Sequence, residues 1–224
     1  MKITWLGQAG LLFEKDDFTI LIDPYLSDSV KAINPKNYRR VPVLEELFKI
    51  KPDIMLFTHN HLDHYDPETV GHYITQHTSV TVLSPYSVWN DVRKIGGDNN
   101  YVLFDRHTTW TQNGISFMAV TAEHSDKTAI GIIIDDRNKK YYITGDTLYN
   151  EKIFEEIPED IDCVFLPING VGNNMNMTDA YHFCQRINPK YAVPLHFGMF
   201  DSVDANKFEF RNKIIPQIYK EVKF

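Results

Sequence analysis

Cysteine, basic charge and long apolar runs are all scarce in this sequence, and each scarcity excludes a class of protein. The two cysteines, Cys163 and Cys184, lack Cys-x-x-Cys spacing, so we expect reduced, buried thiols and neither a redox pair nor a thiolate metal site. No apolar run is long enough to span a bilayer, and the opening segment MKITWLGQAG has no apolar signal region. The sequence therefore predicts a cytoplasmic protein without a membrane span.

Acidic residues outnumber basic ones. The chain carries 30 Asp and Glu against 23 Lys and Arg, a formal net charge of −7. This balance argues against non-specific binding to nucleic acid or to anionic membranes, although a locally basic pocket is compatible with it. With 224 residues, of which 43% are hydrophobic, the chain is long enough for one domain over residues 1–224 with a substantial core.

One stretch, THNHLDHYD at residues 58–66, holds four candidate metal ligands in six positions: His59, His61, Asp63 and His64. It follows an apolar run of buried-strand length at residues 53–57. At a strand end His59 and His61 point the same way, because side chains repeat with period two, and Asp63 and His64 follow as the chain turns. Imidazole and carboxylate donors suit zinc, manganese or iron. Two pairs of ligands from one turn indicate two metal ions side by side.

Three further polar residues, His124, Asp146 and His196, each come just after an apolar strand-like run. They could reach the same end of a sheet as the stretch at 58–66. The alternative is a polar surface turn that is rich in histidine by chance, since any short motif has a false-positive risk. The three additional residues weigh against that alternative. His72, His77, His107 and His182 lack such a setting, so we do not expect them to be ligands.

The pattern of apolar runs predicts strands alternating with helices in the first half of the chain, which is typical of a mixed α/β protein. We expect strands at residues 2–6, 11–14, 18–22, 53–57, 80–84, 101–104, 108–112, 115–122, 129–136, 140–144, 162–166 and 191–195. We expect helices at residues 43–50, 67–76, 85–95, 178–187 (with Thr178 as N-cap) and 207–222, the last kinked or broken at Pro216.

The spacing His59-x-His61-x-Asp63-His64 resembles the HxHxDH motif of the metallo-β-lactamase fold superfamily. The resemblance implies an α/β fold, a four-layer αββα sandwich of two mixed β-sheets flanked by helices, with metals at one edge of the sheets. It also implies an ordered ligand set. One metal is held by His59, His61 and His124, the other by Asp63, His64 and His196, and Asp146 bridges the two.

The resemblance also gives a role to Asp23, which directly follows the run 18–22 and precedes Pro24. In the superfamily an Asp at this place supports a metal-binding histidine, and such support fixes the tautomer and orientation of the ring. The alternative is that Asp23 simply starts a turn before Pro24, as Asp often does.

Two shorter pieces, LIDPYLSDSV and GDTLY, resemble L-ascorbate-6-phosphate lactonases and their relatives. This resemblance implies that the Tyr149 phenol donates to a developing oxyanion; the alternative is an aromatic residue at the rim. The loop at residues 169–177 resembles one that faces substrate in those relatives, or it is a flexible turn. Residues 25–42, with Arg39 and Arg40, form either part of the site's mouth or a solvated crossover. The lactonases are longer than this chain, so their sugar-lactone substrate does not transfer.

The ligand set implies hydrolytic chemistry. Two metals that share a carboxylate sit about 3.5–4 Å apart and lower the pKa of a bridging water from about 15.7 to roughly 7, which gives a hydroxide nucleophile without a catalytic Ser or Cys. Asp63 would bind metal and orient the hydroxide or move its proton, and Asp146 would set the metal spacing. We expect a hydrolase of a small anionic ester or lactone that uses zinc or manganese, with iron possible. The alternatives are a phosphodiesterase or nuclease acting on small phosphate substrates, and a catalytically silent metal-binding protein.

Overall fold

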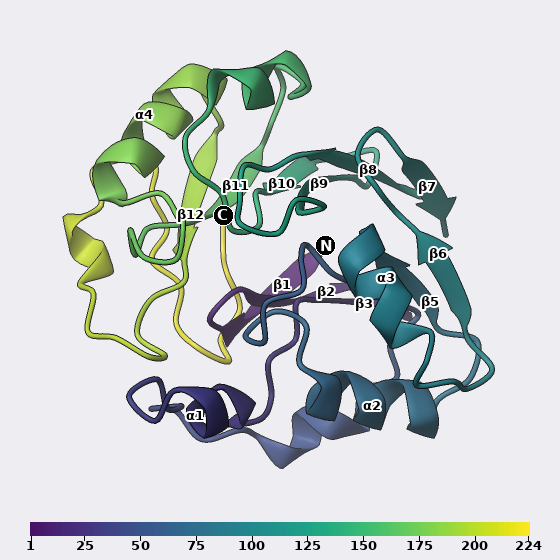
Figure 1. Ribbon diagram of the computed structural model, residues 1–224. Helices are drawn as coiled ribbons and strands as arrows, with labels where there is room; N and C mark the ends of the chain where they lie inside the picture. Colours follow the sequence, from purple (N-terminus) through teal and green to yellow (C-terminus); the bar gives the residue numbers. More distant parts are fainter.

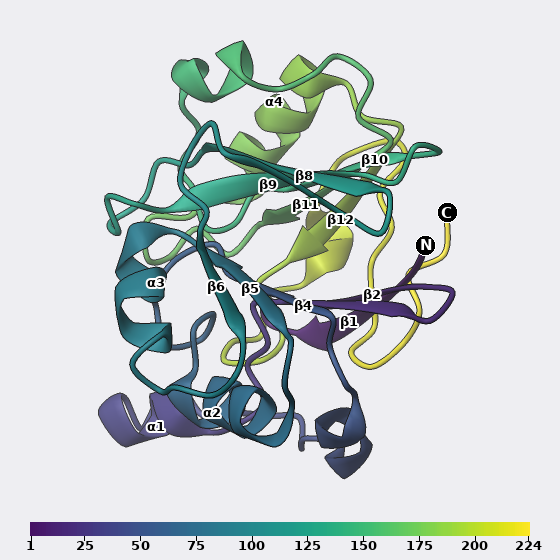
Figure 2. The same cartoon turned by 90° about the vertical axis from the view of Figure 1, so that its right-hand side faces the viewer.

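The computed structural model describes residues 1–224 and contains two six-stranded sheets packed face to face (Figures 1 and 2). The first sheet has the order β1 (Lys2–Gly7), β2 (Gly10–Lys15), β3 (Phe18–Ile22), β4 (Ile54–Leu56), β5 (Thr81–Ser84), β6 (Asn100–Leu103). The second has the order β12 (Tyr191–Leu195), β11 (Cys163–Pro167), β10 (Lys140–Ile143), β9 (Ile130–Asp135), β8 (Ile115–Thr121), β7 (Thr109–Gln112). Both sheets mix parallel and antiparallel pairs.

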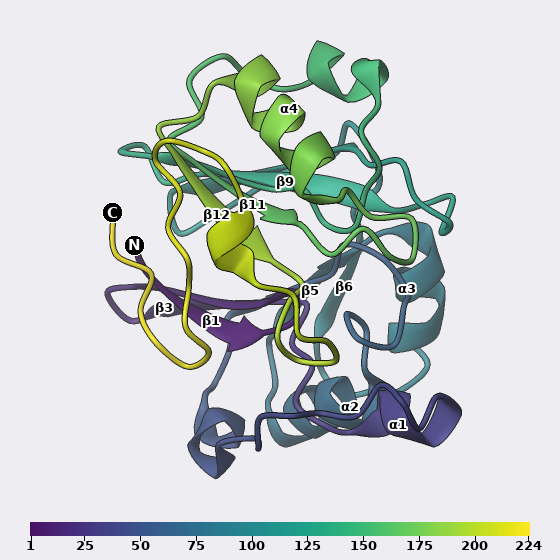
Figure 3. The same ribbon diagram turned by 90° about the vertical axis from the view of Figure 1, so that its left-hand side faces the viewer.

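Helices cover the outer faces of the sheets and complete the predicted αββα sandwich, which is confirmed (Figures 2 and 3). Helices α2 (Pro67–Gln76) and α3 (Tyr86–Val92) pack on the first sheet, and α4 (Met177–Ile187) packs on the second. A short helix, α1 (Ser29–Ile33), interrupts the segment 25–42 and buries none of its residues. None of the helices has the length and apolar character needed to cross a bilayer.

The period-two alternation of the strands divides the apolar residues among three layers of core. In β11, for example, Cys163 and Phe165 face the first sheet, while Val164 and Leu166 face α4. Cys184 lies on α4, so the second sheet separates the two cysteines. Both are buried and unpaired, as the sequence predicts. Burial raises the pKa of both thiols, so they stay protonated at neutral pH.

The C-terminal segment differs from the prediction, because the helix expected at residues 207–222 does not form. Only one 3-10 turn, η3 (Ala205–Lys207), precedes an extended path along the edges of both sheets. The Val222 amide donates to the Ile3 carbonyl (2.8 Å) and the Ile214 amide to the Ala192 carbonyl (2.9 Å). Backbone pairing with the exposed strand edges is therefore favoured over the helix that the spacing of apolar residues suggested. Pro216 also removes a backbone donor that a helix would use.

Smaller differences occur at two other segments. The helix expected at 43–50 is a 3-10 helix, η1 (Glu45–Lys49). Helix α4 is capped by Asn176 and not by Thr178: the Asn176 side chain accepts from the amides of Thr178 (2.8 Å) and Asp179 (3.0 Å). The Asp179 carboxylate accepts in return from the Asn176 amide (3.3 Å), which completes a capping box. This cap fixes the end of the loop 169–177 that precedes α4.

Candidate metal centre

The predicted ligands come together because of strand direction. Strands β3, β4, β5 and β6 run parallel to one another, and β8, β10, β11 and β12 share one direction in the other sheet. Side chains that follow these strands therefore meet at one edge of the sandwich. The ligand candidates that follow β4, β8, β10 and β12 are His59, His61, Asp63, His64, His124, Asp146 and His196.

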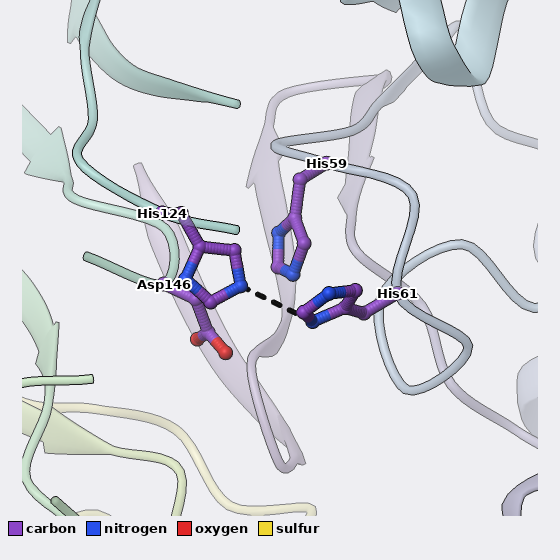
Figure 4. Close-up of side chains that lie close together, drawn as sticks. All are labelled: His59, His61, His124 and Asp146. Carbon is purple, nitrogen blue, oxygen red and sulfur yellow. Dashed lines mark hydrogen bonds between the residues drawn. The ribbon is translucent and has the colours of Figure 1, made fainter. Parts of the chain in front are cut away.

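These side chains form two groups, and within each group the ligand atoms lie within 4.8 Å of one another. The first consists of His59, His61, His124 and Asp146, and the second of Asp63, His64 and His196. Figure 4 shows the first group, with three imidazole rings and a carboxylate turned toward a common centre. His61 Nδ1 and His124 Nε2 are 3.1 Å apart (dashed line in Figure 4). The grouping matches the two ligand sets that the resemblance implies.

The Asp146 carboxylate lies between the two groups. It belongs to the first group, yet its Oδ1 is 3.3 Å from His64 Nε2 and its Oδ2 is 3.2 Å from His196 Nε2. A carboxylate that belongs to the first group and also contacts two ligands of the second lies where a group shared between two metal ions would lie.

The donor atoms fit a pair of divalent metal ions. His59 Nε2 is buried and has no hydrogen-bond partner, and the buried His64 Nε2 lies in a 3.3 Å charge contact with Asp146 Oδ1. A buried polar atom left without a partner costs about 1–3 kcal/mol, so an unpartnered imidazole nitrogen directed at the first group is consistent with a metal-binding role. The set contains nitrogen and oxygen donors and no thiolate, which suits zinc, manganese or iron.

The charges inside the site reinforce this fit. Burial opposes the positive charge of His196, but Asp146 and Asp63 outweigh it and raise the His196 pKa to about 10. In the same way Asp146 and Asp23 overcome burial and hold the pKa of His64 well above its usual value. Burial, together with His64, lowers the pKa of His59 well below its usual value. Without metal, the site therefore balances its carboxylates with two imidazolium protons.

Asp23 links two of the predicted ligands, His64 directly and His59 through Thr58. Its Oδ2 accepts from His64 Nδ1 (2.8 Å) and from the Thr58 hydroxyl (2.5 Å), and its Oδ1 accepts from the Thr58 amide (2.8 Å). Because Thr58 gives its only hydroxyl proton to Asp23, its oxygen accepts from His59 Nδ1 (3.1 Å). Both rings then carry a proton on Nδ1 and direct Nε2 at the site: in His59 this nitrogen is free, and in His64 it becomes free when its imidazolium proton is lost. This is the contact that the role expected for Asp23 requires.

Gly145, between β10 and Asp146, allows the second sheet to approach Thr58. A Cβ at this position would lie 2.9 Å from Thr58 Cβ and 2.9 Å from the Ile130 carbonyl oxygen. Its φ of +62° also belongs to the left-handed region that favours glycine. The glycine thus brings Asp146 close to the His59 side of the site.

Gln8 is a site residue that the sequence analysis missed. It lies in the turn between β1 and β2, where its Nε2 donates to Asp63 Oδ2 (2.8 Å) and lies 3.0 Å from His196 Nδ1. Its backbone carbonyl accepts from the His196 amide (3.0 Å) and from Trp5 Nε1 (3.0 Å). The available signal was its place after the first strand, between Gly7 and Gly10, at the same edge as the metal ligands.

The loop 169–177 lies at the site, and its asparagines contact the predicted ligands. Asn174 Nδ2 donates to Asp146 Oδ2 (2.8 Å), and Asn169 Nδ2 lies 3.0 Å from His196 Nδ1. The Asn173 carbonyl accepts from His124 Nδ1 (3.2 Å), which leaves His124 Nε2 to face the first group. The loop therefore orients ligands as well as bordering the space above them.

Tyr149 requires a correction, because the structure does not bring it to the site. Its hydroxyl donates to Glu151 (2.8 Å), and its ring packs edge-on against Phe154, 5.3 Å away, and near Phe183 of α4. The oxyanion role expected for Tyr149 is therefore wrong in this structure. The position three residues after Asp146 did not reveal that the chain turns toward α4.

A pocket of about 340 Å³ opens above the two groups. Four predicted ligands form part of its lining: His61, Asp63, Asp146 and His196. The other lining residues are Gln8, Val30, Asn37, Asn169, Val171, Gly172, Asn174, Phe200 and Asp201. Since Val30 and Asn37 belong to segment 25–42, this segment forms part of the mouth. The size suits a small molecule.

Comparisons with known proteins agree with this fold. Residues 2–196 match the family described as "Beta-lactamase superfamily domain". The "UPF0173 metal-dependent hydrolase" of Carboxydothermus hydrogenoformans is 30% identical over 95% of this chain and 92% of its own length. A protein with the same family name from Methanopyrus kandleri is 27% identical over 96% and 91%. The chain therefore belongs to the β-lactamase superfamily, and within it to the UPF0173 family of metal-dependent hydrolases.

Two solved structures share the fold. Igni18, described as a metallo hydrolase from Ignicoccus hospitalis, aligns with a TM-score of 0.79 at 21% identity and covers 100% of this chain and 97% of its own. An isothiocyanate hydrolase from Delia radicum gut bacteria aligns with a TM-score of 0.77 at 19% identity, covering 100% and 99%. At these identities the likeness concerns the fold alone.

The hydroxyl of Thr58 gives a first test of the site. Thr58→Val keeps the shape of the side chain but removes the link between Asp23 and His59, so we expect metal affinity to fall 10–100-fold, as is typical when a group that orients a metal-binding histidine is lost. The measurement is competition with a chromophoric chelator. Thr75→Val, which removes an exposed hydroxyl bonded to the Gly71 carbonyl within α2, is the control and should leave metal affinity unchanged. Unchanged affinity in Thr58→Val would contradict the network.

Metal binding should release protons. At pH 7 His64 and His196 are protonated in the metal-free protein, and a metal ion must displace both protons, so we expect about two protons per chain and tighter binding as pH rises. Calorimetry in buffers of different ionisation enthalpy measures the release.

The same shifts predict the stability of the chelator-treated protein. Histidines with raised pKa values stabilise the fold below pH 6.5, and this contribution is lost as pH rises toward about 10. The metal-free protein should therefore melt at lower temperature at pH 9 than at pH 7.

In the calorimetric experiment on proton release, metal binding without proton release would refute the ligand assignment.

Proposed function

We propose that this protein is a dinuclear metal-dependent hydrolase that cleaves a small ester or lactone, with a site of the lactonase-like kind. The observation that carries the proposal is the Asp146 carboxylate, which lies between two ligand groups at the floor of an open pocket. Relatives named metal-dependent hydrolases, matched over nearly the whole chain, support the same class.

In this proposal His59, His61 and His124 hold one metal ion and Asp63, His64 and His196 hold the other, with Asp146 shared between them. When bound, two divalent ions would supply a Lewis acid for the substrate carbonyl and a water of lowered pKa as nucleophile. Zinc or manganese is the proposed metal, and iron is compatible with the same donors. No serine or cysteine nucleophile is needed.

The residues of the chain orient the reacting groups. Burial raises the pKa of Asp63, but His196 and His64 outweigh this effect and hold it well below its usual value, so its carboxylate is an acceptor at neutral pH. Gln8 holds one oxygen of this carboxylate (2.8 Å), and the carboxylate lines the pocket. Asp63 is therefore placed to accept a hydrogen bond from the attacking water and to pass its proton to the leaving oxygen.

The amides of Gln8, Asn169 and Asn174 also border the pocket and fix Asp63, His196 and Asp146. Preorganised groups of this kind lower the cost of reorganising the site during the reaction. Tyr149 has no part in the proposed mechanism, because its hydroxyl is bonded to Glu151 outside the pocket.

The alternative of a phosphodiesterase or nuclease is less well supported. Phosphate recognition commonly uses Arg or Lys, and neither residue type lines the pocket. The alternative of a silent metal-binding protein is consistent with the fold, since a fold alone does not establish turnover. The open pocket beside both ligand groups favours an enzyme.

Asp146 provides the test of the proposed function. Asp146→Ala removes the carboxylate shared by the two groups, so we expect loss of metal, and loss of ester hydrolysis by at least 100-fold, while the chain stays folded. Elemental analysis, a p-nitrophenyl ester assay and circular dichroism measure the three properties.

Cys163→Ala is the control for a nucleophile of another kind. Cys163 is buried between the sheets, so this variant should hydrolyse the ester like the unmodified protein. An Asp146→Ala protein with full metal and full turnover would overturn the proposal, as would a folded Cys163→Ala protein that has lost catalysis.

A further inference from the structure

We propose that the substrate is an uncharged ester or lactone whose apolar group lies against Val30, Val171 and Phe200. This inference rests on the proposed hydrolase function and deepens it by naming the substrate class. It differs from the expectation of an anionic substrate, because no Lys or Arg side chain lines the pocket.

The charges around the pocket are the first argument. The lining contains neither Lys nor Arg, and it contains one carboxylate, Asp201, beyond those of the predicted metal ligands. An anionic group on the substrate, away from the metal ions, would meet this carboxylate without a compensating cation. Like charges held close in a partly buried pocket repel more strongly than in water.

The two arginines near the mouth are engaged elsewhere. Arg39 donates to the Tyr25 carbonyl (2.6 Å), the Val41 carbonyl (3.1 Å) and the Tyr219 hydroxyl (2.7 Å). Arg40 donates to the backbone carbonyl of Asp201 (2.5 Å) and lies over the ring of Tyr38. Both side chains tie the segment 25–42 to other parts of the chain, and neither lines the pocket.

The apolar part of the wall is the second argument. Val30 on α1, Val171 in the loop 169–177 and Phe200 after β12 come from three separate segments and border the same pocket. Val171 is 69% exposed, which leaves apolar surface at the mouth for a substrate to cover. Phe200 is held by an edge-on contact with Tyr25, 5.7 Å between ring centres. A fixed aromatic wall and an exposed valine suit an alkyl or aryl substituent.

Apart from Asp201 and the predicted metal ligands, the polar part of the wall carries no charge. Asn37, Asn169, Asn174 and Gln8 supply amides, which bind neutral carbonyl and ether oxygens by hydrogen bonds. The pocket therefore combines an apolar wall, neutral amides and the metal ligands, a combination that suits a small neutral acyl compound.

The charge of the pocket also affects the product. Water adds to the carbonyl carbon, the bond from this carbon to the alkoxy oxygen breaks, and one proton goes to the leaving oxygen, giving an alcohol and a carboxylic acid. The acid loses its second proton to solvent at neutral pH. The resulting carboxylate lies in a pocket with Asp201, so repulsion favours its release over that of the neutral substrate.

Paired substrates test the inference in metal-loaded, full-length protein. The neutral p-nitrophenyl pentanoate and the anionic mono-p-nitrophenyl glutarate have acyl chains of similar length and the same leaving group. We expect kcat/KM to be at least tenfold higher for the pentanoate. Equal values, or a preference for the glutarate, would overturn the inference while leaving the hydrolase function intact. Absence of hydrolysis of any ester or lactone would overturn the proposed function as well.

Three variants assign the preference to the pocket. Asp201→Asn keeps an Oδ1 acceptor for the amides of Gly198 and Val203, both at 3.0 Å, and should raise kcat/KM for the glutarate but not for the pentanoate. Val171→Ala and Phe200→Ala should lower kcat/KM for the pentanoate about three- to tenfold. They should have little effect on kcat/KM for the shorter p-nitrophenyl acetate, so the preference for the longer acyl chain should shrink. Leu103→Ala, an exposed apolar residue on β6 outside the pocket, is the control. Unchanged chain-length preference in both apolar variants would refute the role of this wall.

Discussion

The Asp146 carboxylate is the group on which the arrangement of the site depends. It is buried, it belongs to the first ligand group, and it lies within 3.3 Å of imidazole nitrogens of His64 and His196 in the second. A buried carboxylate is costly unless it is paired, so its neighbours must carry positive charge. In the metal-free protein that charge is a proton on each of these histidines, and two metal ions would replace both protons. Gly145 lets the chain place the carboxylate there.

Strand direction explains why such distant residues share one site. Each ligand follows a buried strand, and the carboxyl ends of parallel strands in both sheets lie at one edge. The supporting contacts come from the same edge, since Asp23 follows β3 and Gln8 follows β1. The sandwich therefore sets the positions of the ligands, while the loops at 25–42 and 169–177 border the pocket, and the loop 169–177 also orients ligands through its asparagines.

The sequence predicted the ligand groups because strand ends and a dense motif are local features. The expected helices at 67–76 and 178–187 formed, since their apolar spacing is also local. The prediction of a C-terminal helix was wrong because Val222 and Ile214 pair with strand edges that no local pattern reveals. The role predicted for Tyr149 was wrong for a similar reason, because the distance along the chain from Asp146 does not give the direction of a side chain. Gln8 was missed because its role depends on a contact with Asp63 across 55 residues of sequence.

The central claim is that this edge of the sandwich holds two metal ions. Elemental analysis of protein purified without an affinity tag or added metal tests it most directly. The account predicts about two transition-metal ions per chain, drawn from zinc, manganese and iron, bound tightly enough to survive gel filtration. Protein that is free of metal, and that also fails to bind zinc, manganese and iron at neutral pH, would contradict the account.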